Sequence, residues 1–448
     1  SSLNARVRVE NLSVDPFWPY YRQYVPFKKI TGTWETDSRL QGTIDNFTAA
    51  GSISVKRLFF NYPGVFDAPL TPQQVTVSYS LKRKPSEVAV EDTRVAVDGV
   101  QIKGRCSISD IGTEDVMISA SATTTDIPLE KFHGYIPFGI IPDGTANFIK
   151  THIRGGNYRL LEGSLNGRVS QITSMEKQDN NKILYIKAAV EKGLMTFGPK
   201  VPNISGINGE LEIKEKDFHL HNMSGRFGDS PLTLEGSLTN YCMDDPLGYP
   251  FTMTMTPGPK EIAWLLGTKR SDRLFIDGKN TLHLTGKGTA EDYTLEGKWD
   301  FTEASYRFRD IFSKPKKQQN VISFKTGIRN EELHIESFRY DLAPFILRAS
   351  GVYHFKDRHI ASLTMETDAF RVENLARNLP PLIKFQPRGS FRLAANGSSP
   401  PGNASEMRWG GSIAFSDVSF KPLENSRPVT SLKGSFKLSG DGMESSPL

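Results

Sequence analysis

Two histidines, His219 and His221, come nearest in this chain to the spacing of a metal site. They alternate with the period of a β-strand, so their side chains point to one face and could share an ion. No carboxylate or cysteine stands at a matching offset, and the other histidines are scattered along the chain. We therefore expect solvated strand histidines and predict no metal site.

Reactive motifs are also missing. The segments 278–280 (GKN) and 286–288 (GKG) lack the rest of a phosphate-binding loop. No Gly-x-Ser-x-Gly nucleophile elbow occurs. We predict that the chain is not an enzyme, has no catalytic residues and uses no cofactor.

The two cysteines, Cys106 and Cys242, are 136 residues apart, close to the repeat length described below. They fall near corresponding strand ends of neighbouring repeats, and the sequence leaves open whether they pair.

The charge of the chain offers little direction. The net charge is +5 over 448 residues, and the basic clusters 82–84 and 314–317 fall in predicted loops with little aromatic interleaving. Nucleic-acid binding would require a basic stripe with stacking residues. We expect solvated loop tips and no nucleic-acid partner, with contact to anionic lipid head groups as the lesser alternative.

The strongest signal is a repeated pattern of apolar residues. In three of its four copies the pattern begins two residues after a glycine. Large residues come in the order apolar, any, apolar, any, any, apolar, any, apolar, and the first positions 53, 188, 299 and 413 lie 135, 111 and 114 residues apart. The four copies are Ile53, Val55, Leu58 and Phe60; Ala188, Val190, Gly193 and Met195, with Phe197 after them; Trp299, Phe301, Ala304 and Tyr306, with Phe308 after them; and Ile413, Phe415, Val418 and Phe420. A fixed period of this kind indicates a repeat protein.

Alternation within each copy predicts a strand with one apolar face. A slip of one residue would turn the rest to the other face, so the recurrent slip predicts a β-bulge that restores it. A second pair of strand segments also repeats at identical offsets. Its members are Phe218, Leu220, Met223, Phe227, Leu232, Leu234 and Gly236, matched by Leu333, Ile335, Phe338, Leu342, Leu347, Ala349 and Gly351. We interpret these segments as short antiparallel strands.

Helical spacing appears between the strand groups. Aspartate or proline opens stripes at about 15–24, 126–136, 259–266 and 368–379, where aspartate is expected to cap and proline to occupy the first turn. Each repeat is then about six strands and one short amphipathic helix. The predicted repeats are 1–125, 126–256, 257–367 and 368–448, the last cut short.

The predicted fold is mostly β: an elongated, curled antiparallel sheet, or repeating β-groove, with one short helix per repeat. No run of 18 apolar residues occurs. The N-terminus has no initiator methionine and the last repeat stops before its expected strand, so we expect the chain to be part of a longer protein.

Three segments carry a resemblance to a known family. The segments 132–137 (FHGYIP), 141–150 (IPDGTANFIK) and 155–158 (GGNY) resemble the AsmA-like envelope proteins, especially the YhdP-type branch. Strand starts such as 389–393 (GSFRL) and 411–415 (GSIAF) are similar to the C-terminal repeats of AsmA and TamB. The resemblance implies a bridge-like lipid transfer protein in the periplasm of a Gram-negative bacterium. It also implies an inner-membrane anchor outside this chain, phospholipid as cargo and both membranes as partners.

The residues alone allow a groove or a closed core. An apolar sheet face with few helices to cover it must close on itself or hold an apolar partner, for which acyl chains are suited. The predicted groove lining is Ile53, Val55, Leu58, Phe60, Val190, Met195, Phe197, Phe218, Leu220, Leu232, Leu234, Trp299, Phe301, Tyr306, Phe308, Leu333, Ile335, Ile413, Phe415, Val418 and Phe420. In an open groove, Phe301→Asp and Phe415→Asp are expected to stop transport and leave folding intact.

Two other functions fit the same pattern. One is a structural or assembly factor of the envelope that docks partner proteins through exposed strand edges. The other is an extended carbohydrate-binding surface, which would need exposed aromatic rings with polar neighbours. Lipid transfer is the leading prediction.

Overall fold

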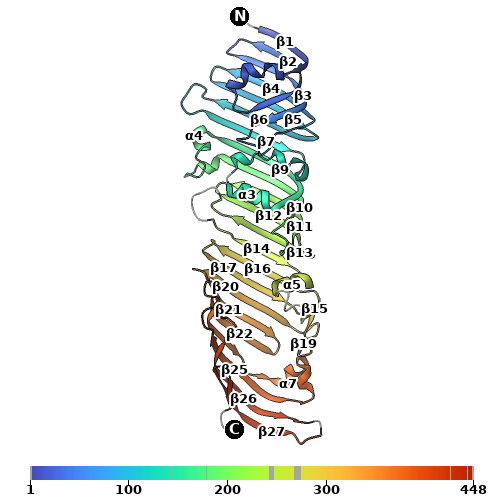
Figure 1. Cartoon of the computed structure of the whole chain (residues 1–448), viewed down its shortest axis with the longest axis vertical. Coiled ribbons are helices and arrows are strands. Elements are labelled where there is room, and N and C mark those ends of the chain that lie inside the picture. Colours follow the sequence, from blue (N-terminus) through green and yellow to red (C-terminus); the bar gives the residue numbers. More distant parts are fainter. Residues whose placement is uncertain are drawn as a thin grey trace. The chain divides into compact units, whose positions relative to one another are not determined.

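The computed structural model describes residues 3–141, 143–177, 179–241, 247–266, 274–423, 425–440 and 442–445. The chain divides into two compact units, both built mainly of antiparallel strands (Figure 1). Unit 1 comprises residues 1–226 and 237–246, and unit 2 comprises 227–236 and 247–448. The four predicted repeat boundaries remain a prediction.

Unit 1 is a sheet in which neighbours in sequence are neighbours in space. Its strands are β1 (Leu3–Ser13), β2 (Lys29–Gly42), β3 (Phe47–Asn61), β4 (Gln74–Lys84), β5 (Glu87–Val97), β6 (Val100–Ser109), β7 (Met117–Thr124), β8 (Ile127–Pro128), β9 (Ile153–Arg168), β10 (Leu184–Met195), β11 (Ile204–Lys214) and β12 (Asp217–Phe227). Each strand from β1 to β7 pairs with the next, β9 pairs with β7, β8 and β10, and β10 pairs with β11. Within the described residues β1 pairs only with β2, so the sheet of unit 1 is open at that edge.

Unit 2 repeats this arrangement. Its strands are β13 (Ser230–Leu238), β14 (Phe251–Met255), β15 (Leu274–Gly278), β16 (Thr281–Gly288), β17 (Asp292–Asp300), β18 (Ala304–Phe308), β19 (Phe312–Lys314), β20 (Asn320–Arg329), β21 (Glu332–Leu342), β22 (Phe345–His354), β23 (His359–Thr367), β24 (Phe370–Arg371), β25 (Arg388–Ser398), β26 (Arg408–Phe420), β27 (Val429–Gly440) and β28 (Gly442–Ser445). The main sheet runs in pairs from β13 through β14, β16, β17, β20, β21, β22 and β23 to β25, β26, β27 and β28. β15, β18 and β19 form a separate small sheet.

The predicted fold class, a mostly β chain with an open, curled antiparallel sheet and few short helices, is confirmed. The strands are longer than predicted, reaching 15 residues in β3 and 16 in β9. Bulges explain the error, because each one breaks the period-two pattern and makes a single long strand look like two short ones.

At four places a glycine near one end of a strand faces an irregular point of a neighbouring segment. Gly32, Gly156, Gly278 and Gly389 all have positive φ, between +102° and +141°. A Cβ on any of them would lie 2.6 to 3.2 Å from backbone atoms of the facing strand. Only glycine tolerates both the conformation and the close approach. We call each of these four contacts a glycine joint. The repeated sequence pattern encodes this contact.

The predicted bulge is confirmed in the first, second and fourth copies. There the pairing register shifts beside Arg57, Lys192 and Asp417, whose φ angles are +51°, +55° and +52°. In the third copy β17 ends at Asp300 and the chain resumes as β18 in the small sheet. Local hydrogen bonds hold this break, since Asp300 accepts the Thr302 N–H at 2.8 Å.

The helical segments are short. They are η1 (Asp15–Phe17), α1 (Trp18–Tyr21), η2 (Arg22–Tyr24), α2 (Leu129–Phe132), η3 (His133–Tyr135), η4 (Phe138–Ile140), α3 (Asp143–His152), α4 (Val169–Ile172) and η5 (Asn180–Ile183) in unit 1, and α5 (Pro259–Leu266), α7 (Val372–Leu375), η6 (Ala376–Asn378) and α8 (Pro380–Ile383) in unit 2. All four predicted stripes therefore contain a helix, whereas α3, α4, α8, η4 and η5 lie outside them.

The expected aspartate caps are wrong. The residues that precede η1, α2 and α7 are Val14, Pro128 and Arg371, and none makes a side-chain cap. Asp126 instead binds Arg159 at 2.8 Å, and Asp368 binds Arg348 at 2.8 and 2.9 Å. Pairing with a cross-strand arginine satisfies these carboxylates better than an isolated helix end.

Candidate functional site

One face of the unit 1 sheet is lined by apolar residues across nine strands. Residues directly opposite each other in paired strands share a face, so the register traces rows across the sheet. Two such rows are Ala5, Leu40, Ala49, Leu81, Val90, Cys106, Ala120, Leu165 and Leu184, and Val9, Thr36, Ile53, Val77, Val95, Ile102 and Thr124. At a strand spacing of about 4.8 Å the longer row covers roughly 40 Å.

Unit 2 has the same construction. One row across eleven strands is Leu234, Met253, Leu284, Gly297, Phe324, Phe338, Ala349, Met365, Ala395, Gly411 and Leu438, and beside it run Leu232, Met255, Leu282, Trp299, Ile322, Tyr340, Leu347 and Thr367. The longer row covers roughly 50 Å. We call the surface traced by these rows the apolar face of each unit.

Much of the apolar face is only half-buried. In unit 1 Val77, Val95 and Ile102 are intermediate in exposure, although they lie in the interior of the sheet. The helical segments of this unit make their main contacts with β9 and β2. The central strands β4 to β6 therefore keep an apolar surface that a closed two-layer core would bury.

Aromatic rings of unit 2 lie across the glycines of neighbouring strands. A methyl group added to Gly297 would lie 2.1 Å from Cζ of Phe324, and one added to Gly286 would lie 2.4 Å from Cε1 of Phe251. Gly397 stands in the same way under the ring of Trp409, at 2.9 Å from Cε3. The large side chains thus lie flat and keep the apolar face even.

A few polar groups interrupt the apolar face, and they bind one another. In unit 1 Ser38 and the Tyr79 hydroxyl form a hydrogen bond of 2.8 Å. In unit 2 the Tyr306 hydroxyl contacts that of Tyr340 at 2.5 Å and donates to Asn320 at 3.0 Å. Burial raises the pKa of both tyrosines, so both stay neutral. No charge therefore enters the apolar face at these points.

The predicted lining residues fall into three groups of burial. Val55, Val190, Phe301, Phe415 and Val418 are buried. Half-buried are Ile53, Leu58, Phe60, Met195, Phe218, Leu220, Leu232, Leu234, Trp299, Tyr306, Leu333, Ile335, Ile413 and Phe420. Phe197 and Phe308 are exposed.

The third copy forms a local core rather than an open stretch of lining. Phe301 lies between Trp299 and Tyr306, with ring centroids 4.7 and 5.7 Å away. Beneath it the Lys314 ammonium donates to the carbonyls of Phe301, Thr302 and Ala304 at 2.5, 2.9 and 2.6 Å. The small sheet thus packs on one end of the apolar face of unit 2.

Sequence reasoning missed the central strands. Val75, Val77 and Leu81 of β4 and Leu284 and Leu295 of unit 2 lie on the apolar face, yet none was predicted as lining. The signal was present, because residues 74–82 alternate between polar and apolar side chains without a break. It lacked the bulge motif that guided the prediction.

The prediction that the two basic clusters are loop tips is wrong for residues 82–84 and for Lys314, whereas residues 315–317 lie in an exposed turn as predicted. Residues 82–84 end β4, where Lys82 pairs with Glu91 at 2.7 Å and Lys84 with Glu87 at 2.9 Å. Lys314 is 1% exposed in β19, and Lys316 pairs with Asp277 at 2.6 Å. Carboxylates on neighbouring strands, which sequence spacing does not reveal, pair with Lys82, Lys84 and Lys316. Lys314 binds backbone carbonyls instead.

His219 and His221 stack with ring centroids 5.6 Å apart. His221 Nε2 lies 2.9 Å from Glu212, which also accepts from the Tyr185 hydroxyl at 2.9 Å. These hydrogen bonds lower the pKa of Glu212. The strand register therefore places the Glu212 carboxylate beside His221, which the spacing in the sequence does not reveal. The described residues contain no group of three ligands able to hold a metal.

Cys106 lies on the apolar face of unit 1 as a free thiol. Cys242 lies outside the described residues. The described residues therefore do not test their pairing, which the sequence left open. In the described part of the chain no helix has the length and apolar character needed to cross a bilayer.

Comparison with known proteins identifies the family. The family model described as YhdP protein matches residues 2–245, more than half of the 448-residue chain. No curated protein and no solved structure matches the chain. The match covers the segments 132–137, 141–150 and 155–158 but not the strand starts 389–393 and 411–415. The YhdP family is an envelope protein family. This chain belongs to the YhdP protein family.

Proposed function

We propose that this chain is part of a bridge-like lipid transfer protein that holds phospholipid acyl chains along its apolar face. The observation that carries the proposal is a continuous row of apolar side chains across each unit that stays half-buried in the protein alone. An apolar ligand that covers these rows would remove them from water. Membership of an envelope family supports the same function.

The energetics favour a continuous surface over isolated sites. Moving an acyl chain into water costs about 0.8 kcal/mol for each CH₂, so a tail of ~16 carbons faces a barrier of roughly 12 kcal/mol. Stepwise movement along the rows keeps most of the tail out of water at each stage. The aromatic rings that lie flat over Gly286 and Gly297 keep this part of the apolar face smooth.

The cellular setting is part of the proposal. The protein would act in the periplasm of a Gram-negative bacterium, anchored to the inner membrane by a segment outside this chain, and would move phospholipid between the inner and outer membranes. Its partners would be phospholipid, the two membranes and envelope proteins.

The test compares bound lipid in matched variants. Leu284 is half-buried on the apolar face of β16, and Thr285 is exposed on the opposite face. Lipid extracted from the purified chain and quantified by mass spectrometry should fall for Leu284→Asp and stay unchanged for Thr285→Asp. Both variants should melt close to the wild-type temperature, because a half-buried carboxylate can reach water.

Two results would reject the proposal. One is wild-type protein that carries no lipid after purification and takes up none from phospholipid vesicles. The other is a Leu284→Asp variant that unfolds outright, since an unpaired carboxylate in a closed core costs several kcal/mol.

A further inference from the structure

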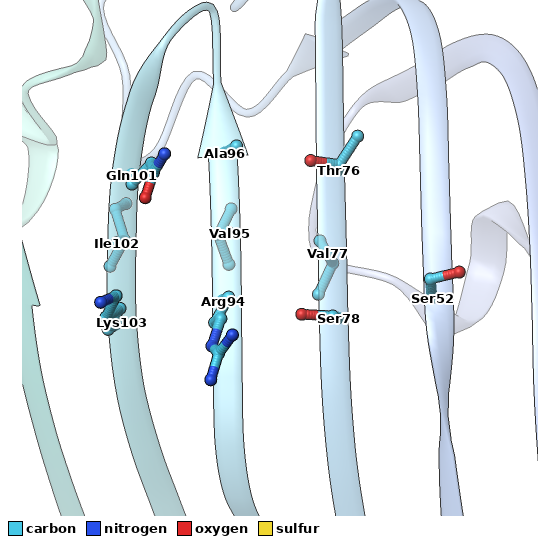
Figure 2. A pocket seen from close by; sticks show the side chains of 10 residues that line it. All are labelled: Ser52, Thr76, Val77, Ser78, Arg94, Val95, Ala96, Gln101, Ile102 and Lys103. Atoms are coloured by element: carbon cyan, nitrogen blue, oxygen red, sulfur yellow. The ribbon is translucent and has the colours of Figure 1, made fainter.

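The face of unit 1 opposite the apolar rows contains a hollow lined by both polar and apolar residues. Its volume is 150 Å³, and it opens over β3, β4, β5 and β6 (Figure 2). The polar side chains that line it are those of Ser52, Thr76, Ser78, Arg94, Gln101 and Lys103. Figure 2 shows these side chains on the near face, while Val77, Val95 and Ile102 lie behind the strands.

Two cations stand directly opposite each other in this hollow. Arg94 of β5 and Lys103 of β6 are cross-strand partners, so their side chains leave the sheet side by side. Like charges at such a position destabilise an antiparallel pair. The lining residues include no carboxylate. The nearest acidic partner is Asp92, which lies beside the hollow, 3.4 Å from the Arg94 guanidinium.

Four of the other polar side chains in the lining are exposed to solvent. Within the described residues the Ser52 and Ser78 hydroxyls, the Gln101 amide and the Lys103 ammonium have no side-chain hydrogen-bond partner. Ser52 and Ser78 lie in the same transverse row as Arg94 and Lys103. A guanidinium and an ammonium on neighbouring strands, with two serine hydroxyls in the same row, are donors of the kind that bind the oxygen atoms of a phosphate group.

We infer that this hollow binds a phosphate-type oxyanion, either a soluble phosphate ester or a lipid phosphate. The volume is about five times the ~30 Å³ that one water occupies in the liquid, which is enough for a tetrahedral anion. A bound anion would relieve the repulsion between Arg94 and Lys103. The inference is independent of the proposed function, because the hollow and the apolar face are on opposite sides of the sheet.

The experiment is a titration of the whole chain with inorganic phosphate at constant ionic strength, followed by calorimetry and by melting temperature. Saturable binding is expected, and Arg94→Gln and Lys103→Gln should each weaken it about tenfold, as loss of one charge-assisted hydrogen bond implies. Arg105→Gln is the matched control: it removes one charge from the same face of β6, and Arg105 binds Ser121 at 3.1 Å outside the hollow. The affinity of Arg105→Gln for phosphate should equal that of the wild type.

Vesicles of phosphatidylglycerol identify the source of the phosphate. If the Arg94 and Lys103 substitutions weaken vesicle binding, the hollow binds a lipid head group. If they leave vesicle binding unchanged, the hollow binds a soluble phosphate ester. In phosphate-free buffer at low salt Lys103→Gln should raise the melting temperature, because it removes the repulsion. A phosphate response that does not saturate, equal responses in all four proteins, or a lower melting temperature of Lys103→Gln would overturn the inference.

Discussion

At the scale of single residues, glycines determine how evenly the apolar face is packed. Gly297 has ordinary backbone angles, so its role is to make room for the ring of Phe324. The same arrangement recurs at Gly397 under Trp409. Small residues under large rings let a strongly aromatic sheet stay thin.

The first prediction concerns this packing. Gly297→Ala should destabilise the chain by about 1–3 kcal/mol, because the new methyl group forces Phe324 out of its rotamer. Gly327→Ala is the control, since its methyl group would find no atom nearer than 3.6 Å. Urea unfolding measures both variants. Equal stability of the two would show that Phe324 moves aside freely.

Lys314 is the most unusual charged residue in the described chain. Its side chain is 1% exposed and surrounded by three carbonyl oxygens. Burial lowers its pKa from 10.5 to about 8, against the opposing attraction of Asp300 and Glu303. Between these two values the unfolded chain holds a proton that the folded chain has lost.

The second prediction follows from this difference in bound protons between the folded and the unfolded chain. The free energy of unfolding should rise with pH between about 8 and 10, by up to roughly 1.4 kcal/mol per pH unit from this residue. Lys314→Met should remove the rise, and Lys317→Met, at an exposed neighbour, should keep it. Denaturant unfolding across this pH range measures the slopes. Identical slopes for wild type and Lys314→Met would show that Lys314 is not the source of the rise.

At the scale of elements, the short helices α2, α5 and α7 are each attached to the sheets by one glutamate. Glu130 of α2 accepts the Gly156 N–H at 3.1 Å, and Glu373 of α7 accepts the Gly389 N–H at 3.1 Å. Both glycines belong to the recurrent glycine joint. The helix of each of these repeats is therefore tied to the point where the strand irregularity is built.

The third prediction tests the most buried of these attachments. Glu261 of α5 is 2% exposed and accepts from the Asp229 N–H at 3.0 Å and the Ser230 hydroxyl at 2.7 Å. Glu261→Ala should cost about 1–3 kcal/mol and speed amide exchange over 259–266, because buried donors lose their acceptor. Hydrogen exchange with mass spectrometry measures this effect.

Its control is Lys260→Ala. Lys260 pairs with Asp229 at 2.7 Å, but the two side chains are 82% and 67% exposed. Solvent screens such a pair, so exchange over α5 should stay at the wild-type rate. Faster exchange in Lys260→Ala alone would show that the surface pair, and not Glu261, holds the helix.

At the scale of the whole molecule, each unit carries its own apolar face across many strands. If lipid moves along these faces, transfer is serial, whereas the amount of lipid held is a sum over the two units. Transfer and occupancy should then respond differently to one substitution. This difference separates a conduit from a storage surface.

The fourth prediction uses that difference. Leu165→Asp in unit 1 and Leu284→Asp in unit 2 should each abolish lipid transfer between labelled vesicles while lowering bound lipid only in part. Asn166→Asp and Thr285→Asp place the same group on the opposite face and should leave both quantities unchanged. Loss of transfer in strict proportion to bound lipid would argue against serial movement.

These positions replace the two first chosen from the sequence. Phe301 and Phe415 are only 5% and 8% exposed, so a carboxylate there would be buried without a partner. Both substitutions are expected to destabilise the fold whether or not the apolar face is open. Half-buried positions avoid this ambiguity.

The sequence by itself determined the strand character, the bulges and one apolar face, because periods of two and their interruptions are local properties of the backbone. It also indicated the family, through short segments such as 132–137. It did not determine which strands pair. For that reason it missed the cross-strand partners of Lys82 and His221, the central strands of the apolar face and the opposed cations Arg94 and Lys103. Register brings together residues separated in sequence, and it is fixed only when the sheet forms.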